Sequence, residues 1–268
     1  MITLQHVQEA KSKLEGVAYK TPLMKSLNLS DRFAATILLK REDLQLVRSY
    51  KLRGAYNKMC NLSEEQKQNG IVCASAGNHA QGVAYSCMVL GIQGTIYMPS
   101  TTPKQKINQV ELFGKSNVKI VLAGDTFDDA YREAVTYGKE NNLTFIHPFD
   151  DPMVIAGQGT VALEVLADAE EPIDYLFVPI GGGGLAAGVC TVFKELSPTT
   201  IIIGVEPEGA PSMKTSIANG VNTTLEHIDK FVDGAAVKRV GDLTFNICKD
   251  ILNQVITIQL PLIAELIQ

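Results

Sequence analysis

The sequence predicts an α/β protein with two parallel-sheet α/β domains. Short apolar runs such as Ile71–Ala74 and Ile201–Val205 alternate with segments of helical periodicity. Apolar strands that lack polar alternation are typical of parallel sheets covered by helices on both faces. The chain has 268 residues, which corresponds to about two domains at ~150 residues per domain.

The expected elements begin with a weakly helical stretch at 2–16, a break at 20–23 and a strand at 36–40. Lys51 follows in a loop or at a helix start. Further strands are expected at 71–74, 95–98, 118–122, 144–146, 174–180, 201–205 and 255–258. Further helices are expected at 79–90, 104–113, from 125 or 126 to 140, at 162–169 and at 185–196.

The strands between residues 71 and 147 are expected to form one sheet, and the strands on either side of them, including 36–40, a second sheet. This pattern predicts a small domain at 70–147 inserted into a larger domain made of residues 1–69 and 148–268. The functional site is expected in the cleft between the two domains, because ligand sites commonly lie at domain interfaces.

Composition and charge exclude several classes of function. The net charge is −5 and no basic stripe is present, which argues against a nucleic-acid partner. No apolar run approaches the ~18 residues of a membrane span, and Met1–Lys13 lacks the apolar core of a signal peptide, so a cytoplasmic protein is expected. The cysteines form no CxxC pair and the histidines no HExxH pattern, which predicts buried free thiols and no metal site.

A run of four glycines, Gly181-Gly-Gly-Gly-Leu185, lies between an expected strand and an expected helix. Residues without side chains let several backbone N–H groups converge on an anion at a helix N-terminus. Three interpretations stay open from this motif alone: a phosphate ligand, a dinucleotide and a structural turn. The dinucleotide interpretation is supported by the G-x-G-x-x-A spacing and by Glu206 at the end of the next strand.

A second turn from strand to helix, Ser75-Ala-Gly-Asn-His-Ala-Gln-Gly82, offers backbone amides and polar side chains that suit a carboxylate. Taken alone it is equally well an Asn-capped helix entry. Lys51 in Arg48-Ser-Tyr-Lys-Leu-Arg-Gly-Ala55 is by itself typical of a solvated lysine, and Tyr50 of a core aromatic. Together, however, an amine, a phosphate-binding turn and a carboxylate-binding turn are what pyridoxal 5′-phosphate (PLP) and an amino acid require.

The sequence resembles the PLP-dependent enzymes of fold type II, whose domains are tryptophan synthase β-like, and within them the biosynthetic threonine dehydratases (threonine ammonia-lyases). The resemblance runs from about Thr21 to Ile258. It rests on separate motifs in the same order, which are KREDLQ at 40–45, VRSYKLRGAY at 47–56, ASAGNHAQG at 74–82, Thr102-Pro103 with Lys106, GGGGL at 181–185 and VDGAAV at 232–237.

This resemblance implies a role for each matching residue. Lys51 would hold PLP as a Schiff base, with Tyr50 and Gly234 near the ring and Asn78 hydrogen-bonded to the ring hydroxyl. The phosphate would be held through the backbone amides of Gly181, Gly182, Gly183, Gly184 and Leu185. The substrate carboxylate would be received by Ser75, Ala76, Gly77 and Asn78.

The reaction implied by the resemblance converts L-threonine to 2-oxobutanoate and ammonia, and secondarily L-serine to pyruvate, as the first step of isoleucine biosynthesis. Lys51, once displaced by the substrate, would remove the Cα proton as a general base. The implied partners are these small-molecule substrates and further copies of the chain in a homo-oligomer.

Three departures from the family pattern are visible. Serine racemases of this superfamily carry a serine where this chain has Ala76, so racemisation is disfavoured. They also bind a divalent cation near the segment Glu206–Ser212, but Ser212 stands where a carboxylate would be, and no metal is expected. The family continues past Ile258 with further strands and helices, whereas the sequence here continues with Gln259–Gln268, which does not resemble them, and no regulatory domain is expected.

The missing elements would include a polar side chain that meets the pyridine nitrogen of PLP. They would also cover the sheet, so exposed apolar surface, weak PLP retention and low turnover are expected of the chain as written. The alternative expectation is therefore an inactive or weakly active remnant of the fold, which binds PLP or a partner only.

Overall fold

The computed structural model describes residues 2–259 and contains two parallel sheets and a small antiparallel one. This result confirms the predicted α/β class. The helices are α1 Leu4–Leu14, α2 Leu27–Phe33, α3 Lys51–Cys60, α4 Glu64–Asn69, α5 Asn78–Leu90, α6 Lys104–Gly114, α7 Phe127–Glu140, α8 Pro152–Asp168, α9 Gly184–Leu196, α10 Ser212–Asn219 and α11 Asp242–Ile251, with 3-10 turns η1 Glu42–Leu44 and η2 Lys115–Asn117. The strands are β1 Leu23–Lys25, β2 Leu38–Lys40, β3 Ile71–Ala74, β4 Gly94–Met98, β5 Val118–Leu122, β6 Thr144–Phe145, β7 Tyr175–Pro179, β8 Ile201–Pro207 and β9 Gln254–Ile258.

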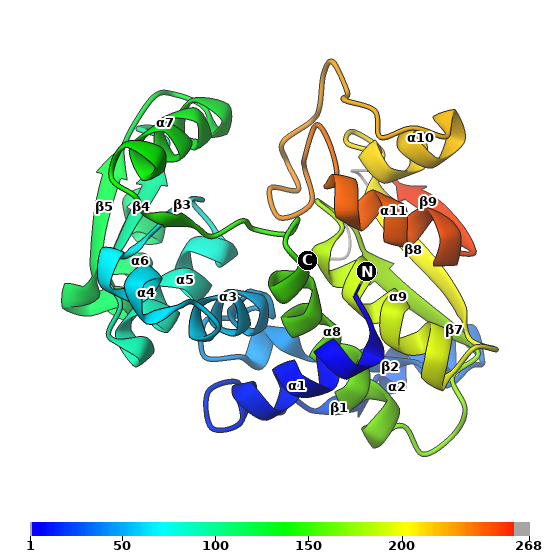
Figure 1. Ribbon diagram of the computed structural model, residues 1–268. Coiled ribbons are helices and arrows are strands. Elements are labelled where there is room, and N and C mark those ends of the chain that lie inside the picture. The colour runs from blue at the N-terminus through cyan, green and yellow to red at the C-terminus, as the bar shows by residue number, and fades with distance from the viewer. Residues whose placement is uncertain (1, 260–268) are drawn as a thin grey trace.

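The first parallel sheet has the order β5-β4-β3-β6 and is covered by helices on both faces. Ile71 and Cys73 of β3 point into an apolar cluster shared with α5 and α6. Val72 and Ala74 alternate to the opposite face and pack against Ala130 and other residues of α7. Figure 1 shows α7 on one side of this sheet and α5 and α6 on the other. Burial on both faces explains why these strands read as continuous apolar runs.

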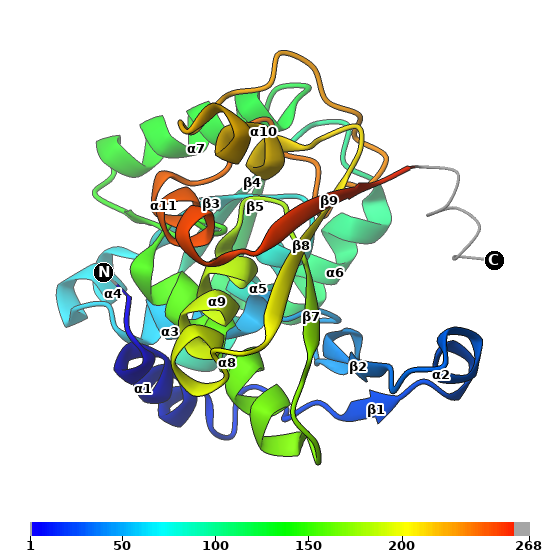
Figure 2. The same cartoon turned by 90° about the vertical axis from the view of Figure 1, so that its right-hand side faces the viewer.

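The second parallel sheet has the order β7-β8-β9 and lies in the other half of the molecule (Figure 2). Val178 of β7 and Ile202 of β8 face a cluster built with α1, α8 and α9. The alternate positions Tyr175 and Phe177 are 58% and 59% exposed, so this face of β7 is left bare by the described residues. The helices α1, α8 and α9 thus pack on the other face of β7, which carries Val178.

The strand at 36–40 was wrongly expected to join the second parallel sheet. Only residues 38–40 of it form a strand, β2, which pairs antiparallel with β1 in a separate two-stranded sheet, with Leu23 opposite Lys40. Both strands are largely exposed, and α2 between them packs little against the body of the molecule (Figure 2). The apolar run at Leu38–Leu39 thus lies on a projecting hairpin, which a local sequence pattern cannot distinguish from a core strand.

The helix expected at 162–169 is in fact α8, which starts at Pro152 and has 17 residues. Asp151 caps it, since its side chain accepts hydrogen bonds from the N–H groups of Met153 and Val154. Gly157 sits in the first half because α3 approaches closely: a Cβ added there would lie 2.5 Å from the carbonyl oxygen of Arg53. Burial on nearly every side removes the one-sided periodicity on which the prediction relied.

The division into a small domain at 70–147 and a larger one made of 1–69 and 148–268 stays a prediction. The four strands of the first parallel sheet all lie within 70–147, and the three strands of the second all lie within 148–268. The expectation for the chain's end concerns residues 260–268, which lie outside the described residues. In the part of the chain that the structure describes, no helix is long and apolar enough to cross a membrane.

Candidate active site

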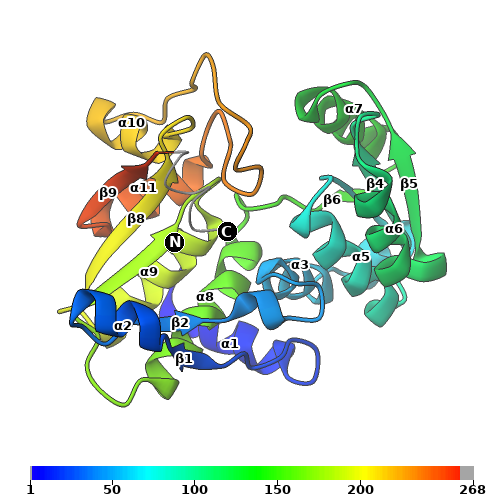
Figure 3. The same cartoon turned by 180° about the vertical axis from the view of Figure 1, so that it is seen from behind.

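Lys51 is the first residue of α3, a helix that lies between α5 and α8 (Figure 3). Glycines stand at both contacts. A Cβ added to Gly82 of α5 would lie 3.0 Å from the carbonyl carbon of Lys51, and one added to Gly54 would lie 2.7 Å from the carbonyl oxygen of Val154 in α8. The backbone that carries Lys51 is therefore held from two sides at close range.

The side chain of Lys51 is directed by one hydrogen bond and by an aromatic neighbour. Its Nζ donates to the carbonyl oxygen of Pro148 at 3.0 Å and lies 5.5 Å from the centre of the Tyr50 ring. Burial lowers the pKa of Lys51 to about 8 and raises the pKa of Tyr50 to about 12. Lys51 thus has a larger share of neutral, nucleophilic amine near pH 7 than an ordinary lysine.

The glycine turn, residues 181–185, connects β7 to α9 and exposes consecutive backbone donors. Among residues 2–259, no hydrogen bond occupies the backbone N–H groups of Gly181, Gly182, Gly183, Gly184 or Leu185. Gly183 has a φ of +90°, which favours glycine. A Cβ added to Gly182 would lie 2.2 Å from the ring of Phe149. The turn is therefore a close-packed cradle of free donors at a helix N-terminus, which suits a phosphate.

The Ser75–Asn78 turn connects β3 to α5 and has the same character. The N–H of Gly77 donates to Ser75 Oγ at 3.2 Å, whereas those of Ala76, Asn78 and His79 have no partner within the described part of the chain. A Cβ added to Gly77 would meet no heavy atom within 4 Å. Free donors beside open space at a second helix N-terminus suit a carboxylate.

The segment His147–Asp150 connects β6 to α8 and brings the parts of the site together (Figure 1). Pro148 accepts the hydrogen bond from Lys51, and the next residue, Phe149, packs against the glycine turn at Gly182 and Gly184. Sequence reasoning treated His147-Pro148 only as the end of a strand and missed this role. No local signal marks it, because its partners lie elsewhere in the sequence.

Gly234 lies beside the glycine turn. A Cβ added to Gly181 would be 3.1 Å from the carbonyl oxygen of Gly234. Asn78 is less closely tied: its side chain is exposed and makes no hydrogen bond with the residues described. The geometry thus joins Lys51, Tyr50, the glycine turn and Gly234 by contacts. It places the Ser75–Asn78 turn at the N-terminus of α5, the helix that packs against the backbone of Lys51.

A second histidine missed from the sequence is His79, which is 3% exposed. Its Nε2 lies 2.9 Å from the carbonyl oxygen of Ile146, which can only accept, so Nε2 carries the proton. Burial, assisted by the nearby charge of Lys51, lowers the pKa of His79 to about 3. Burial also lowers the pKa of His147. Both rings are therefore neutral near pH 7 and add no positive charge beside Lys51.

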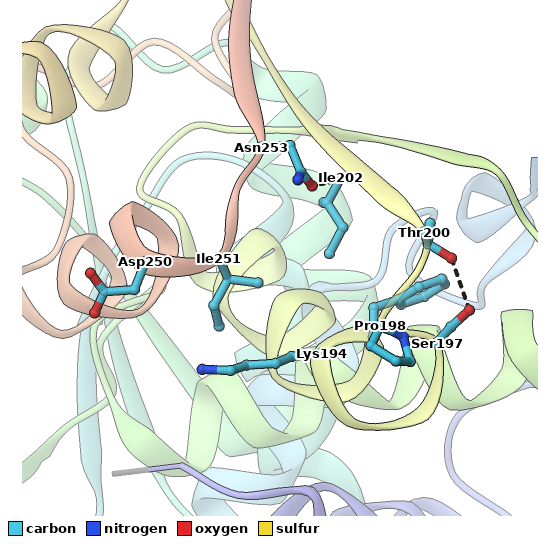
Figure 4. Close-up of a pocket in the computed structure, with 9 residues that line it drawn as sticks. Lys194, Ser197, Pro198, Thr200, Ile202, Asp250, Ile251 and Asn253 are labelled. Atoms are coloured by element: carbon cyan, nitrogen blue, oxygen red, sulfur yellow. Dashed lines mark hydrogen bonds between the residues drawn. The ribbon is translucent and has the colours of Figure 1, made fainter.

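Two other features lie apart from these residues. Across residues 2–259, no three His, Cys, Asp or Glu side chains gather as metal ligands would, and Glu206 instead accepts the N–H groups of Met213 and Lys214. A surface hollow of about 160 Å³ is lined by residues such as Lys194, Thr200 and Asp250 (Figure 4). It lies at the C-terminal end of α9, the opposite end from the glycine turn.

Residues 14–268 match the family of pyridoxal-phosphate dependent enzymes, and the chain belongs to this family. It is 54% identical over 258 residues to L-threonine dehydratase biosynthetic IlvA of Bacillus subtilis (strain 168), covering 96% of this chain and 61% of that protein. The protein of the same name from Halalkalibacterium halodurans is 52% identical over 257 residues, which cover 96% of this chain and 62% of that protein. The chain thus spans about three fifths of the length of these relatives.

Solved structures support the same placement. The processed form of threonine deaminase isoform 2 from Solanum lycopersicum superposes with a TM-score of 0.91 at 44% identity, covering 95% of this chain and 74% of that one. Maize serine racemase gives a TM-score of 0.93 at 31% identity, covering 98% and 79%. These matches confirm the resemblance to PLP-dependent enzymes of fold type II and favour a phosphate ligand over a dinucleotide at the glycine turn.

The residues present fit PLP, the cofactor of the family. PLP carries an aldehyde, which needs an amine, and a phosphate, which needs hydrogen-bond donors. Lys51 offers a half-buried amine with a lowered pKa. The glycine turn offers the free donors, in a cradle at Gly182 that a Cβ would fill. Both are linked through Pro148 and Phe149.

Proposed function

We propose that this chain catalyses the PLP-dependent deamination of L-threonine to 2-oxobutanoate and ammonia, and of L-serine to pyruvate, as the first step of isoleucine biosynthesis. The observation that carries this proposal is the pairing of Lys51 Nζ with Pro148 in the same segment that packs on the donor-rich glycine turn. Family membership and the names of the relatives support the substrate.

In this proposal, Lys51 holds PLP through a Schiff base, and Tyr50, Asn78 and Gly234 lie around the ring. The phosphate is received by the free N–H groups of Gly181, Gly182, Gly183, Gly184 and Leu185. The substrate carboxylate is received by Ser75, Ala76, Gly77 and Asn78. The larger domain, 1–69 with 148–268, and the smaller domain, 70–147, contribute opposite sides of the cleft.

When bound, PLP supplies an aldehyde that bonds to amino groups and a ring that accepts electrons from the substrate's Cα. The chain's own residues orient the substrate and transfer its Cα proton. The free donors of the Ser75–Asn78 turn would hold the substrate carboxylate at the N-terminus of α5, the helix that packs against α3, which carries Lys51. Lys51 Nζ takes this proton as a general base, and its lowered pKa suits proton transfer near neutral pH. Loss of the proton and of the β-hydroxyl removes water from threonine, and hydrolysis of the resulting enamine gives 2-oxobutanoate and ammonia.

Ala76 supports elimination over racemisation in this proposal. Return of a proton from the opposite face of Cα needs an acid there, and a methyl group has no proton to give. Incubation with L-serine should therefore yield pyruvate with little D-serine. D-serine formed as fast as pyruvate would show that another residue performs this transfer.

The proposal includes a cytoplasmic location and a homo-oligomeric assembly. The five cysteines are free thiols, and Cys73 and Cys87 are buried as expected. Free thiols accord with a reducing compartment. Sedimentation of the purified chain at several concentrations would give its oligomeric state.

The decisive experiment is borohydride reduction of the chain with PLP, followed by peptide mapping and an assay of 2-oxo acid release from L-threonine. The label is expected on Lys51, and Lys51→Ala should abolish both label and product while partly retaining phosphate binding. Lys58→Ala, on the same helix and paired with Asp151 at 2.7 Å, is the matched control and should keep both. A label on another lysine contradicts the proposal, and PLP binding without product favours the non-catalytic alternative.

A further inference from the structure

Asp150 holds the N-terminus of α11, a helix far from it in sequence. Its carboxylate accepts hydrogen bonds from the backbone N–H groups of Asp242 at 3.0 Å, Leu243 at 3.0 Å and Thr244 at 3.2 Å. A negative charge at a helix N-terminus is also favourable to the helix dipole. The preceding residue, Gly241, leaves no room for a side chain, because a Cβ there would lie 2.2 Å from Asp150 Oδ1.

The capped end of α11 in turn holds the glycine turn. Thr244 Oγ1 donates to the carbonyl oxygen of Gly182 at 2.7 Å, and the N–H of Gly241 donates to the same oxygen at 3.2 Å. The peptide unit from Gly182 to Gly183 is planar and trans. Two bonds to its oxygen therefore fix the direction of the N–H of Gly183, one of the free donors of the cradle.

Asp150 is also part of the turn that positions the acceptor of Lys51. His147 Nδ1 accepts from the N–H groups of Phe149 at 3.3 Å and Asp150 at 2.8 Å, which closes the chain around Pro148. The carbonyl oxygen of Pro148 accepts the hydrogen bond from Lys51. One short turn thus contacts the lysine on one side and, through the Asp150 carboxylate, the cradle on the other.

We infer that Asp150 is a positioning residue that couples the Lys51 amine to the glycine turn, and so aligns the aldehyde and phosphate ends of the cofactor site. The inference rests on the proposed function for the identity of the ligand. The coupling itself follows from the contacts of Asp150, Thr244 and Gly182. Loss of the carboxylate should loosen the phosphate end of the site first, because the Gly182 carbonyl then loses its fixed partner.

Asp151 provides a matched control, since it is the neighbouring aspartate and also caps a helix. It accepts from the N–H groups of Met153 at 2.8 Å and Val154 at 3.2 Å, at the start of α8. No hydrogen bond joins the Asp151 side chain to the glycine turn or to α11 in the part of the chain that is described. Asp151→Ala therefore removes the same group and a comparable cap without touching the proposed coupling.

The test measures the Kd of PLP and of pyridoxal, which lacks the phosphate, for the full chain and for Asp150→Ala, Asp150→Asn and Asp151→Ala. Asp150→Ala is expected to raise the Kd of PLP about tenfold or more and that of pyridoxal much less. Asp150→Asn, which keeps one acceptor oxygen and serves if the alanine variant does not fold, should lie in between. Asp151→Ala should stay within about twofold of the parent chain.

Equal weakening of PLP and pyridoxal, or equal effects of Asp150→Ala and Asp151→Ala, would overturn the inference. Borohydride labelling of Lys51 in the parent chain tests the proposed function separately. If the parent binds no PLP, that function fails, and NMR titration with inorganic phosphate decides the coupling. Relative to the parent chain at the same phosphate concentration, the amide signals of Gly182 and Gly183 should be shifted in Asp150→Asn and unchanged in Asp151→Ala. Signals that are unchanged in the Asp150 variant overturn the coupling.

Discussion

Lys51 owes its reactivity to neighbours that lie outside its own sequence motif. Helices α5 and α8 fix its backbone, Pro148 accepts from its amine, and the neutral rings of His79 and His147 add no competing charge. The amine therefore sits in a poorly hydrated place with one good hydrogen bond. Desolvation of this kind disfavours the charged form of a lysine and explains the direction of its pKa shift.

This environment predicts how the rate of Schiff-base formation depends on pH. With the pKa of Lys51 at about 8, about one amine in ten is neutral at pH 7, against fewer than about one in a thousand for an ordinary lysine. The rate at which PLP joins the apo chain should therefore rise about tenfold from pH 6 to pH 7 and level off above about pH 8. Stopped-flow absorbance measures this rate, and a rise that continues to pH 10 would contradict the lowered pKa.

At the scale of elements, the glycine turn is set by what packs against it as much as by its own flexibility. A Cβ on Gly182 meets the Phe149 ring, and Gly183 combines its φ of +90° with a close approach by Thr244. Gly182 and Gly183 are thus required for different reasons. The same sequence motif can form a dinucleotide site or a plain turn, so only the packing partners show which donors remain free.

Gly182→Ala should weaken PLP binding by roughly tenfold or more, because the added methyl group pushes the Phe149 ring or the turn out of place. In the background of Phe149→Ala, which removes the ring, the same substitution should cost much less. Fluorescence titration of PLP in this double-mutant cycle gives the coupling. Additive effects of the two substitutions would show that the ring and the turn act independently.

Helix α3 is tied to α8 and to the segment at 40–42 by a buried network with two charges of each sign. Arg53, 1% exposed, donates to both carboxylate oxygens of Glu42 at 2.8 and 2.9 Å and of Glu164 at 2.6 and 2.9 Å. Lys40 Nζ adds a bond to Glu164 at 2.6 Å. Because Arg53 follows Lys51 by two residues, this network holds the helix turn that carries the amine.

Arg53→Ala is expected to lower the free energy of unfolding by about 3–5 kcal/mol, since it leaves Glu42 and Glu164 buried without their main partner. Arg41→Ala breaks a solvent-accessible pair with Asp43 and should change the free energy of unfolding far less, because water screens exposed pairs. Urea unfolding of the apo chain compares the two. A loss for Arg53→Ala as small as that for Arg41→Ala would show that water solvates the two carboxylates.

At the scale of the whole molecule, the two halves meet where α3 packs against α5, along the segment His147–Asp150 and at an exposed ion pair. Lys106 of α6, beside the four-stranded sheet, pairs with Asp233, which adjoins Gly234 in the other half. Their side chains are 39% and 72% exposed. An exposed pair contributes little to stability. Because Asp233 adjoins Gly234, we expect this pair to affect substrate binding more than stability.

Asp233→Asn should therefore change the free energy of unfolding by less than about 1 kcal/mol and raise the KM for L-threonine roughly twofold to fivefold. Raising the salt concentration should produce the same change in the parent chain and little in the variant, because salt screens exposed charges. Lys67→Ala, which breaks the Lys67–Glu64 pair within α4, is the control and should leave KM unchanged. A KM that responds equally to both substitutions would exclude a specific effect of the Lys106–Asp233 pair.

The sequence by itself determined the α/β class, the two parallel sheets and most of their elements. The strands β3 and β5 have the predicted bounds, Thr126 caps α7 through its side chain, and Gly91 ends α5 in the left-handed conformation. These features are local: side-chain periodicity, a capping hydroxyl and a glycine each act within a few residues. The family resemblance likewise rests on short motifs, which is why Lys51 and the glycine turn could be singled out.

Only the tertiary structure decided how the site is held together. The pairing of β1 with β2, the early start of α8, and the contacts of Phe149 and Asp150 were not visible in the sequence. Asp150 reaches α11 across 92 residues, and Lys51 reaches Pro148 across 97. Contacts over such separations depend on where the whole chain packs, so no local pattern of residues encodes them.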